Sequence, residues 1–177
     1  MVRLLLLSFV FFCLFTSDQS IQWDENQKLI WDNFLGEPNS KSDAAAVTSS
    51  GIVFGYKMSQ VNNTIESITI QASAHFYPEK SWVKLNQADD HILGHEQLHF
   101  DITELFTRKL RLATHRVAPS ENSSKTLDAI HARIVKDLHT MQDLYDNETD
   151  FSRNHENQAL WEKKVKMELE QLKDYKE

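Results

Sequence analysis

Hydrophobic side chains in the second half of the chain recur at the three- and four-residue spacing of helices. This pattern predicts helices over residues 87–114, over residues 125–145 and from His155 onward. Beyond Ser81, glycine and proline occur only as Gly94 and Pro119, which favours long helices. The positions expected to face inward are Ile92, His95, His99, Ile102, Phe106 and Leu110, then Leu127, Ile130, Ile134, Leu138 and Met141, and finally Leu160, Trp161, Val165, Leu169 and Leu172.

Residues 21–77 favour strands instead. Residues 52–56 form an apolar run, and residues 65–74 alternate, with most apolar members on one parity. Leu29, Ile30, Trp31 and Phe34 are further apolar positions, and the segment that contains them ends at a turn signal around Gly36. The connections are short, so we expect a small antiparallel sheet. Strands followed by helices predict an α+β fold, with one domain over residues 21–177.

The N-terminal residues have a different character. Arg3 precedes an apolar run over residues 4–15, which is the layout of a secretory signal peptide. The run is shorter than the ~20 residues that a membrane span needs. We therefore predict a signal peptide over residues 1–20, and a mature chain with no stable membrane span. An uncleaved signal anchor is the alternative.

Charge and cysteine content narrow the possible functions. The net charge of -7 argues against a nucleic-acid partner, because phosphate contacts require clustered lysine and arginine. The single cysteine, Cys13, lies inside the predicted signal peptide. A mature chain without cysteine has no thiolate to attack a substrate or bind a metal. Any metal site must therefore be built from histidine and carboxylate side chains.

The run from His95 to His99 carries the clearest chemistry. Two histidines four residues apart lie on one helix face, and this spacing lets both imidazoles reach one Zn²⁺ ion. Glu96 lies about 100 degrees round the helix from His95. It can take a proton from a water that the zinc polarises. This is the HExxH arrangement of metallopeptidases, so Glu96 is the candidate catalytic base. The alternative is a pair of core histidines on an amphipathic helix.

Other polar residues near this motif have weaker cases. His91 lies about 12 Å along the helix from the second motif histidine, so we expect a neighbour rather than a ligand. We expect Asp101 and Glu104 to form ion pairs, although either could orient an imidazole. Tyr145 is expected in the core, although its hydroxyl could polarise a carbonyl oxygen. Gly94 costs a helix about 1 kcal/mol, so either a close approach or simple tolerance explains it.

Several segments together resemble the bacterial DUF922 family, which is regarded as a group of secreted zinc-dependent peptidases. The most specific segments are His95-Glu96-Gln97-Leu98-His99-Phe100-Asp101-Ile102 and Tyr145-Asp146-Asn147-Glu148-Thr149, and weaker ones surround Trp23, Trp31, Trp82 and Trp161. The resemblance covers nearly all of the chain after residue 20. It implies a zincin-like fold and a secreted or periplasmic location in a bacterium. It supplies no substrate.

The resemblance also implies a third metal ligand shortly after the second specific segment. The family has a histidine at a position where this chain has Phe151. His155 is the predicted substitute, and Asp150 or Glu148 are alternatives that would bind through oxygen.

The sequence therefore predicts a secreted or periplasmic zinc metallopeptidase that acts on an unidentified peptide or protein. Zinc would be held by His95, His99 and His155, with Glu96 as the base. The alternative is a non-catalytic metal- or protein-binding module on a degenerate peptidase fold, which the absence of the family histidine at Phe151 suggests.

Overall fold

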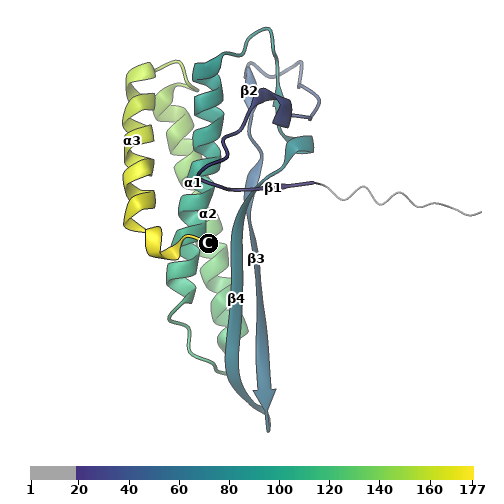
Figure 1. Cartoon of the computed structure of the whole chain (residues 1–177), viewed down its shortest axis with the longest axis vertical. Coiled ribbons are helices and arrows are strands. Elements are labelled where there is room, and N and C mark those ends of the chain that lie inside the picture. Colours follow the sequence, from purple (N-terminus) through teal and green to yellow (C-terminus); the bar gives the residue numbers. More distant parts are fainter. Residues whose placement is uncertain (1–18) are drawn as a thin grey trace, which may run out of the picture.

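A computed structural model describes residues 19–177, and its strands precede its helices (Figure 1). The strands are β1 (Ile21–Gln22), β2 (Ala46–Val47), β3 (Ser50–Val61), β4 (Thr64–Phe76) and β5 (Trp82–Val83); the helices are α1 (Asp90–Thr114), α2 (Ser123–Thr149) and α3 (His155–Gln171); and short 3-10 turns occupy η1 (Trp31–Asn33), η2 (Pro78–Lys80) and η3 (Lys173–Tyr175). This order confirms the predicted α+β fold, with a small antiparallel sheet followed by three helices.

The predicted signal peptide falls on residues that are almost all outside the described part of the chain. Its existence and its cleavage therefore stay predictions. Among residues 19–177, none of the helices combines the length and the hydropathy that crossing a bilayer requires.

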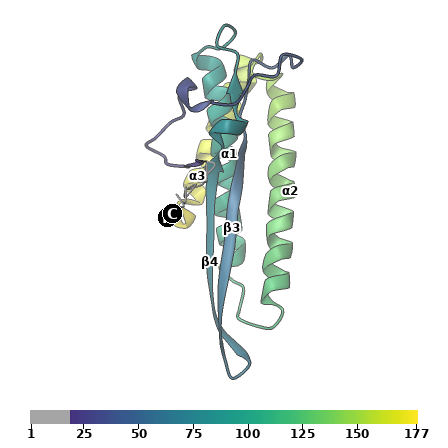
Figure 2. The same ribbon diagram turned by 90° about the vertical axis from the view of Figure 1, so that its right-hand side faces the viewer.

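The strands β3 and β4 form a long ribbon whose tip extends beyond the ends of the helices (Figures 1 and 2). They pair antiparallel from Ser50↔Phe76 to Val61↔Thr64. Asn62 and Asn63 make the turn with φ angles of 47° and 63°, a left-handed conformation that asparagine tolerates better than most residues. The strand β1 adds to the other side of β4, whereas β2 and β5 form a separate two-stranded sheet.

The segment of residues 29–34, where the sequence favoured a strand, is not a strand. The backbone N–H groups of Asn33 and Phe34 donate to Ile30 O and Trp31 O and form a 3-10 turn at Trp31–Asn33, and Ile30 donates its own N–H to Asn33 Oδ1. Leu29 and Phe34 on either side are buried, and the Phe34 ring lies 5.1 Å from the ring of Phe76. The hydrophobic residues therefore anchor an irregular segment on the sheet.

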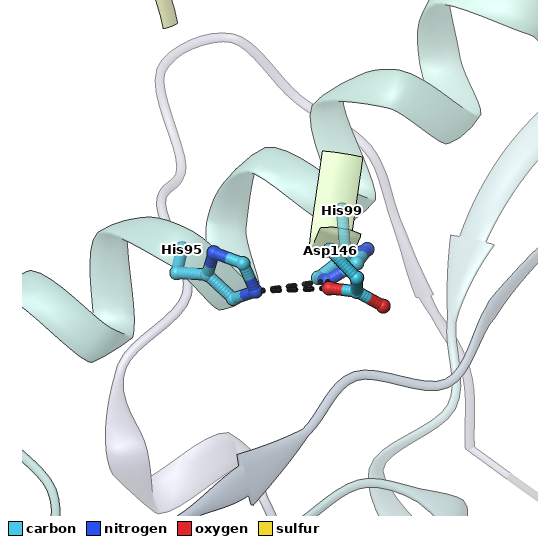
Figure 3. Close-up of side chains that lie close together, drawn as sticks. All are labelled: His95, His99 and Asp146. Atoms are coloured by element: carbon cyan, nitrogen blue, oxygen red, sulfur yellow. Dashed lines mark hydrogen bonds and ion pairs between the residues drawn. The ribbon is translucent and has the colours of Figure 1, made fainter. Parts of the chain in front are cut away.

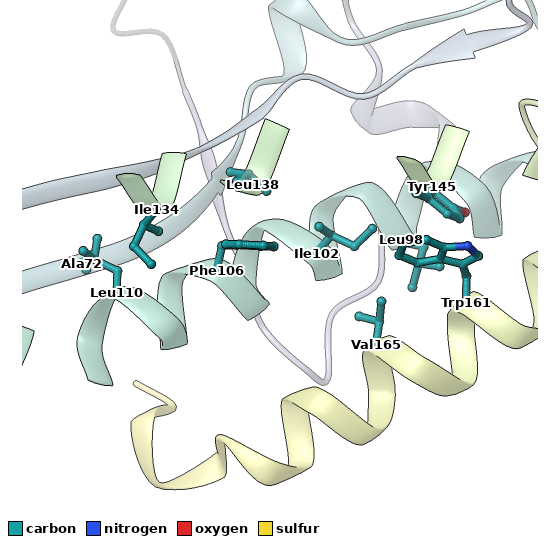
Figure 4. Close-up of a cluster of buried hydrophobic side chains, with 10 residues drawn as sticks. All are labelled: Ala72, Leu98, Ile102, Phe106, Leu110, Ile134, Leu138, Tyr145, Trp161 and Val165. Carbon is teal, nitrogen blue, oxygen red and sulfur yellow. The ribbon is translucent and has the colours of Figure 1, made fainter. Parts of the chain in front are cut away.

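The helix α1 is the centre of the molecule, because β4, α2 and α3 all pack against it (Figures 1 and 2). Asp89 caps its first turn by accepting a hydrogen bond from the backbone of Ile92. Its inward side chains meet those of α2 and α3 in one cluster (Figure 4). The buried members of this cluster are Ala72, Leu98, Ile102, Phe106, Leu110, Ile134, Leu138, Tyr145, Trp161 and Val165. One predicted core residue is wrong, because Leu160 is 60% exposed.

The helix α2 continues beyond Tyr145, where the sequence pattern predicted its end. Two polar side chains in its last turn bond back to backbone carbonyls one turn earlier. Asn147 Nδ2 donates to Asp143 O over 2.6 Å, and Thr149 Oγ1 donates to Tyr145 O over 2.7 Å. Asp146 therefore lies on a helix rather than in a loop.

Candidate metal site

The helices α1 and α2 bring three potential metal ligands together (Figure 3). His95 Nε2 and His99 Nε2 lie 3.2 Å and 2.9 Å from the same oxygen, Asp146 Oδ1. The two nitrogens lie 3.2 Å from each other. These three side chains form a group that could hold a metal ion.

Two glutamine side chains fix the imidazoles from behind. The amide oxygen of Gln158 accepts a hydrogen bond from His95 Nδ1 over 3.1 Å. The amide oxygen of Gln142 accepts one from His99 Nδ1. The orientation of each amide is set independently, since Gln158 Nε2 donates to Glu162 and Gln142 Nε2 donates to His99 O. An amide oxygen can only accept, so each Nδ1 carries the hydrogen. Each neutral ring therefore presents the lone pair of Nε2 to the cluster.

The site consequently gathers three hydrogen-bond acceptors that have no proton between them when both rings are neutral. Such an arrangement is stabilised only by a cation or by an added proton. Burial raises the pKa of Asp146, but the hydrogen bonds with His95 and His99 outweigh burial and hold that pKa well below its ordinary value. Burial lowers the pKa of His99, yet its bond to Asp146 and the charge of Glu96 raise it above the usual value. Both shifts indicate that the site favours positive charge.

The distances suit a small divalent metal. Zinc bonds of about 2.0–2.1 Å place two tetrahedral ligands about 3.3 Å apart. The observed separations of 2.9, 3.2 and 3.2 Å are close to this value. Two imidazole nitrogens and one carboxylate oxygen also match the three protein ligands of many catalytic zinc sites.

Glu96 lies beside this cluster and is 4% exposed. Its Oε2 atom is buried and has no hydrogen-bond partner within the described chain. A buried carboxylate oxygen without a partner is costly, so natural proteins retain one mainly where a ligand or water binds. The charge of Glu96 already acts on the pKa values of His99 and Tyr145.

Tyr145 is a core residue, as the sequence led us to expect. It is fully buried, and its ring lies 4.5 Å from that of His95 and 4.9 Å from that of His99. Its hydroxyl donates to Gln158 Oε1 over 2.7 Å. Burial raises the pKa of Tyr145 well above its ordinary value. Its hydroxyl therefore supports the imidazoles and does not face a substrate.

His155, the predicted third ligand, is not part of the three-residue group. Its ring stacks on that of His91, with the centroids 3.7 Å apart. His91 Nε2 in turn donates to Ser152 O over 2.7 Å. The structure thus places Asp146, and not His155, beside the two motif histidines, and the ligand role of His155 stays a prediction without geometric support.

The two alternative oxygen ligands have other partners. Glu148 Oε2 accepts a hydrogen bond from Trp161 Nε1 over 2.8 Å. Asp150 is exposed and pairs with Arg153 over 2.8 Å.

The opposite face of α1 carries the remaining polar residues of the motif. Asp101 Oδ1 accepts hydrogen bonds from Trp23 Nε1 over 2.7 Å and from Gln97 Nε2 over 2.9 Å. Lys28 lies 3.6 Å from the other oxygen of Asp101, and Gln97 Oε1 accepts the backbone N–H of Leu29. These bonds attach the N-terminal segment to the helix. Asp101 forms an ion pair, as expected, and does not orient either imidazole.

Glu104 is also engaged in ion pairs, 2.8 Å from Arg108 and 3.2 Å from Arg111. Burial nevertheless raises the pKa of Glu104 above its usual value.

Asp146, Gln142 and Gln158 were not predicted from the sequence as site residues. Two signals pointed toward the first of them. Asp146 lies inside one of the two specific segments, and the inward stripe of the second helix continues at the same spacing through the buried Tyr145 and Thr149. Gln158 lies in the segment before Trp161 that also resembles the family, whereas Gln142 carries no such signal. The role of both glutamines arises from the packing of three helices.

The fold and the site together define an α+β protein with a candidate metal centre between two helices. The family model described as "Bacterial protein of unknown function (DUF922)" matches residues 32–156, a range that contains both motif histidines and Asp146. The chain therefore belongs to the DUF922 family. Searches of curated proteins and of solved structures found no match.

Proposed function

We propose that the protein is a zinc-dependent metallopeptidase whose metal is held by His95, His99 and Asp146. One observation carries the proposal: three acceptor atoms converge within 3.2 Å of one another, and beside them the buried Oε2 atom of Glu96 has no hydrogen-bond partner within the described chain. Three acceptors with no proton between them are stabilised by a bound cation. A buried carboxylate oxygen beside them is available to accept a proton.

Each residue has a separate task in this proposal. A zinc ion bound here would supply Lewis-acid polarisation of a carbonyl or water oxygen. Glu96 accepts a proton from the attacking water at its free oxygen and passes it to the leaving amine. Gln142 and Gln158 keep the Nε2 atoms turned toward the cluster, while Tyr145 fills the space behind both rings. The substrate is a peptide or protein, and the location is secreted or periplasmic, as the predicted signal peptide suggests.

The second candidate function is a non-catalytic metal- or protein-binding module. Its motivation was the loss of the family histidine at Phe151. Asp146, on α2, supplies a third potential metal ligand in place of that histidine. The buried Oε2 atom of Glu96, which has no hydrogen-bond partner within the described chain, also has no evident task in a purely structural site. Both observations favour the hydrolase.

The metal content of purified variants tests the ligand set. We expect one zinc per chain in the wild-type protein and in His155→Ala, and a loss of zinc in Asp146→Ala. The reverse pattern, with zinc lost in His155→Ala and retained in Asp146→Ala, would contradict the proposed ligands.

The variant Glu96→Gln tests the chemistry. It should retain zinc and lose hydrolysis of a broad quenched-peptide library by about 10²–10⁴-fold, the usual contribution of a general base. Unchanged hydrolysis in Glu96→Gln would exclude Glu96 as the base. A wild-type protein that binds zinc and cleaves no peptide would favour the non-catalytic module.

A further inference from the structure

Glu162 on α3 connects the candidate metal site to a cavity on the other side of α1. The cavity has a volume of about 770 Å³ and lies between α1, α3 and the N-terminal segment. Trp23 and Leu29 of that segment line it together with Gly94 and Glu162. The Glu162 side chain is exposed, whereas Gln158, which it contacts on the same helix, is only 2% exposed. Glu162 thus lies where the buried part of the site meets the surface.

A series of hydrogen bonds leads from Glu162 to the metal site. Glu162 Oε1 accepts Gln158 Nε2 over 3.1 Å, and Gln158 Oε1 accepts His95 Nδ1 over 3.1 Å. The same oxygen of Gln158 accepts the Tyr145 hydroxyl over 2.7 Å. On the far side of the ring, His95 Nε2 lies 3.2 Å from Asp146 Oδ1. The Gln158 amide therefore turns its donor end toward Glu162 and its acceptor end toward the imidazole.

The amide of Gln158 has two orientations available, which differ by half a turn about its last torsion angle. In the observed orientation, the amide N–H meets the carboxylate of Glu162, which only accepts hydrogen bonds when it is ionised. In the other orientation, the amide oxygen would face that carboxylate, so two acceptors would meet and a hydrogen bond would be lost. Glu162 therefore selects the orientation in which Gln158 presents its oxygen to His95.

The orientation of this amide decides which nitrogen of the neutral His95 ring carries the hydrogen. An oxygen at Nδ1 requires the hydrogen on Nδ1, which leaves the lone pair of Nε2 for a metal. The opposite orientation would place an N–H donor at Nδ1, and the ring hydrogen would move to Nε2, where Asp146 Oδ1 would accept it. In the absence of a metal, Asp146 thus favours the tautomer that cannot bind one, and Glu162 favours the tautomer that can.

We propose that Glu162 is a positioning residue that sets the metal-binding tautomer of His95 through Gln158. The inference rests on the proposed function for the identity of the site and deepens it, because it assigns control of that site to a residue that is not a ligand. Since Glu162 also lines the cavity, this control is reachable from the face of α1 that points away from the cluster.

The tautomer of His95 can be measured in the zinc-free protein at about pH 9, well above the ordinary pKa of histidine. Long-range proton–nitrogen NMR correlation spectra distinguish a ring nitrogen that carries a hydrogen from one that does not. In the wild-type protein we expect the hydrogen on Nδ1. Glu162→Lys replaces an acceptor by a donor, so the amide of Gln158 should turn over and the hydrogen should move to Nε2.

Glu170→Lys is the matched control, because it makes the same charge change at an exposed residue of α3 that also lines the cavity. Glu170 pairs only with the exposed Lys173 in the described chain, and the loss of such a surface pair has little effect. This variant should keep the wild-type tautomer.

The double variant Gln158→Glu with Glu162→Lys tests the orientation of the amide directly. A carboxylate accepts hydrogen bonds at both oxygens, so it presents an acceptor to His95 Nδ1 in either orientation. The hydrogen should therefore return to Nδ1 in the double variant. A change in charge or stability alone would not be reversed in this way.

Zinc affinity, measured by competition with a chromophoric chelator, gives a second readout. Removing a residue directly behind a ligand costs about 10–100-fold in metal affinity, and Glu162 acts one residue farther away. We therefore expect zinc to bind about tenfold more weakly to Glu162→Lys, at the low end of that range. Glu170→Lys should bind zinc within about twofold of the wild type, as expected for an exposed pair.

Three results would each overturn the inference: a hydrogen that stays on Nδ1 in Glu162→Lys, a wild-type ring in any form other than the Nδ1–H tautomer, or an equal shift in Glu170→Lys. The proposed function is scored separately. A wild type that shows the expected tautomers but binds no zinc would remove the metallopeptidase and leave the control of the tautomer by Glu162 in place. Zinc-dependent hydrolysis through Glu96, with an unchanged tautomer in Glu162→Lys, would keep the metallopeptidase and remove the role of Glu162.

Discussion

The two faces of α1 handle polar groups in opposite ways. On the face toward the N-terminal segment, the indole of Trp23, the amide of Gln97 and the ammonium of Lys28 all converge on Asp101. Three donors there meet one acceptor pair. On the face toward α2, the Nε2 atoms of His95 and His99 converge on Asp146 Oδ1. With both rings neutral, all three atoms are hydrogen-bond acceptors and no donor lies between them.

This difference separates structure from function within one short motif. A face on which every donor has an acceptor stabilises the fold and needs nothing further. A face whose acceptors meet without a donor carries a cost that a bound cation removes. Changes on the two faces should therefore produce separable effects, one on metal affinity and the other on the free energy of unfolding.

The largest expected effect is the loss of a histidine from the site face. His99→Ala should lower zinc affinity more than a hundredfold, because removing a direct ligand exceeds the 10–100-fold cost of removing a residue behind a ligand. Competition with a chromophoric chelator measures this affinity. His139→Ala, an exposed histidine on α2, is the matched control and should bind zinc as the wild type does. Equal affinities for both variants would remove His99 from the site.

The glutamine behind His99 should have the next largest effect. Gln142→Leu leaves the imidazole free to rotate and to change tautomer, so we expect zinc affinity to fall about 10–100-fold. The d–d spectrum of the cobalt-substituted protein should change as well, because the ligand orientation changes. Gln171→Leu, exposed at the end of α3, controls for the substitution itself. An unaltered cobalt spectrum in Gln142→Leu would show that the glutamine does not orient the ligand.

A change on the opposite face should lower the free energy of unfolding and leave zinc affinity unchanged. Asp101→Ala leaves the N–H groups of Trp23 and Gln97 without their acceptor, so we expect a loss of about 1–3 kcal/mol in the free energy of unfolding. Urea denaturation of the zinc-free protein measures it. Asp101→Asn keeps an acceptor oxygen and should lose less. A large drop in zinc affinity in Asp101→Ala would show that the two faces are coupled.

The smallest expected effect concerns Gly94, which precedes His95 in the motif. A Cβ atom at this position would meet only Glu162 Oε1, at 4.0 Å, which is ordinary contact. Gly94→Ala should therefore raise the free energy of unfolding by about 0.5–1 kcal/mol, the difference between the two residues in a helix interior. Thermal unfolding with and without zinc checks this gain. A loss of stability would mean that another group approaches Gly94 more closely than the structure indicates.

The parts of the fold governed by local periodicity could be predicted from the sequence. The three helices and the β3–β4 ribbon follow from residue spacing, because each buries one stripe or one parity of side chains. The segment around Trp31 could not be predicted, since backbone hydrogen bonds form a 3-10 turn there and the Asn33 side chain accepts the N–H of Ile30. Local hydrogen bonding of this kind leaves no periodic signal.

The candidate site was predictable to the same extent. His95, Glu96 and His99 share one helix, so their relation follows from helix geometry alone. Asp146 comes from a second helix, and its position depends on how α2 packs on α1 and on the last turn of α2, where Thr149 Oγ1 donates to Tyr145 O. Polar residues near a helix end resemble a loop in sequence, and only the packed structure distinguishes the two.

The positions of His99 and Asp146 along the chain have a consequence for the order in which the protein opens. The two residues lie 47 positions apart, near the start of α1 and the end of α2. A metal held between them closes that whole stretch into a loop, and a cross-link of this length removes about 4 kcal/mol of chain entropy from the unfolded ensemble. Loss of the ion would release the paired ends of both helices together. Metal supply would thus set how long the chain survives in the presence of proteases.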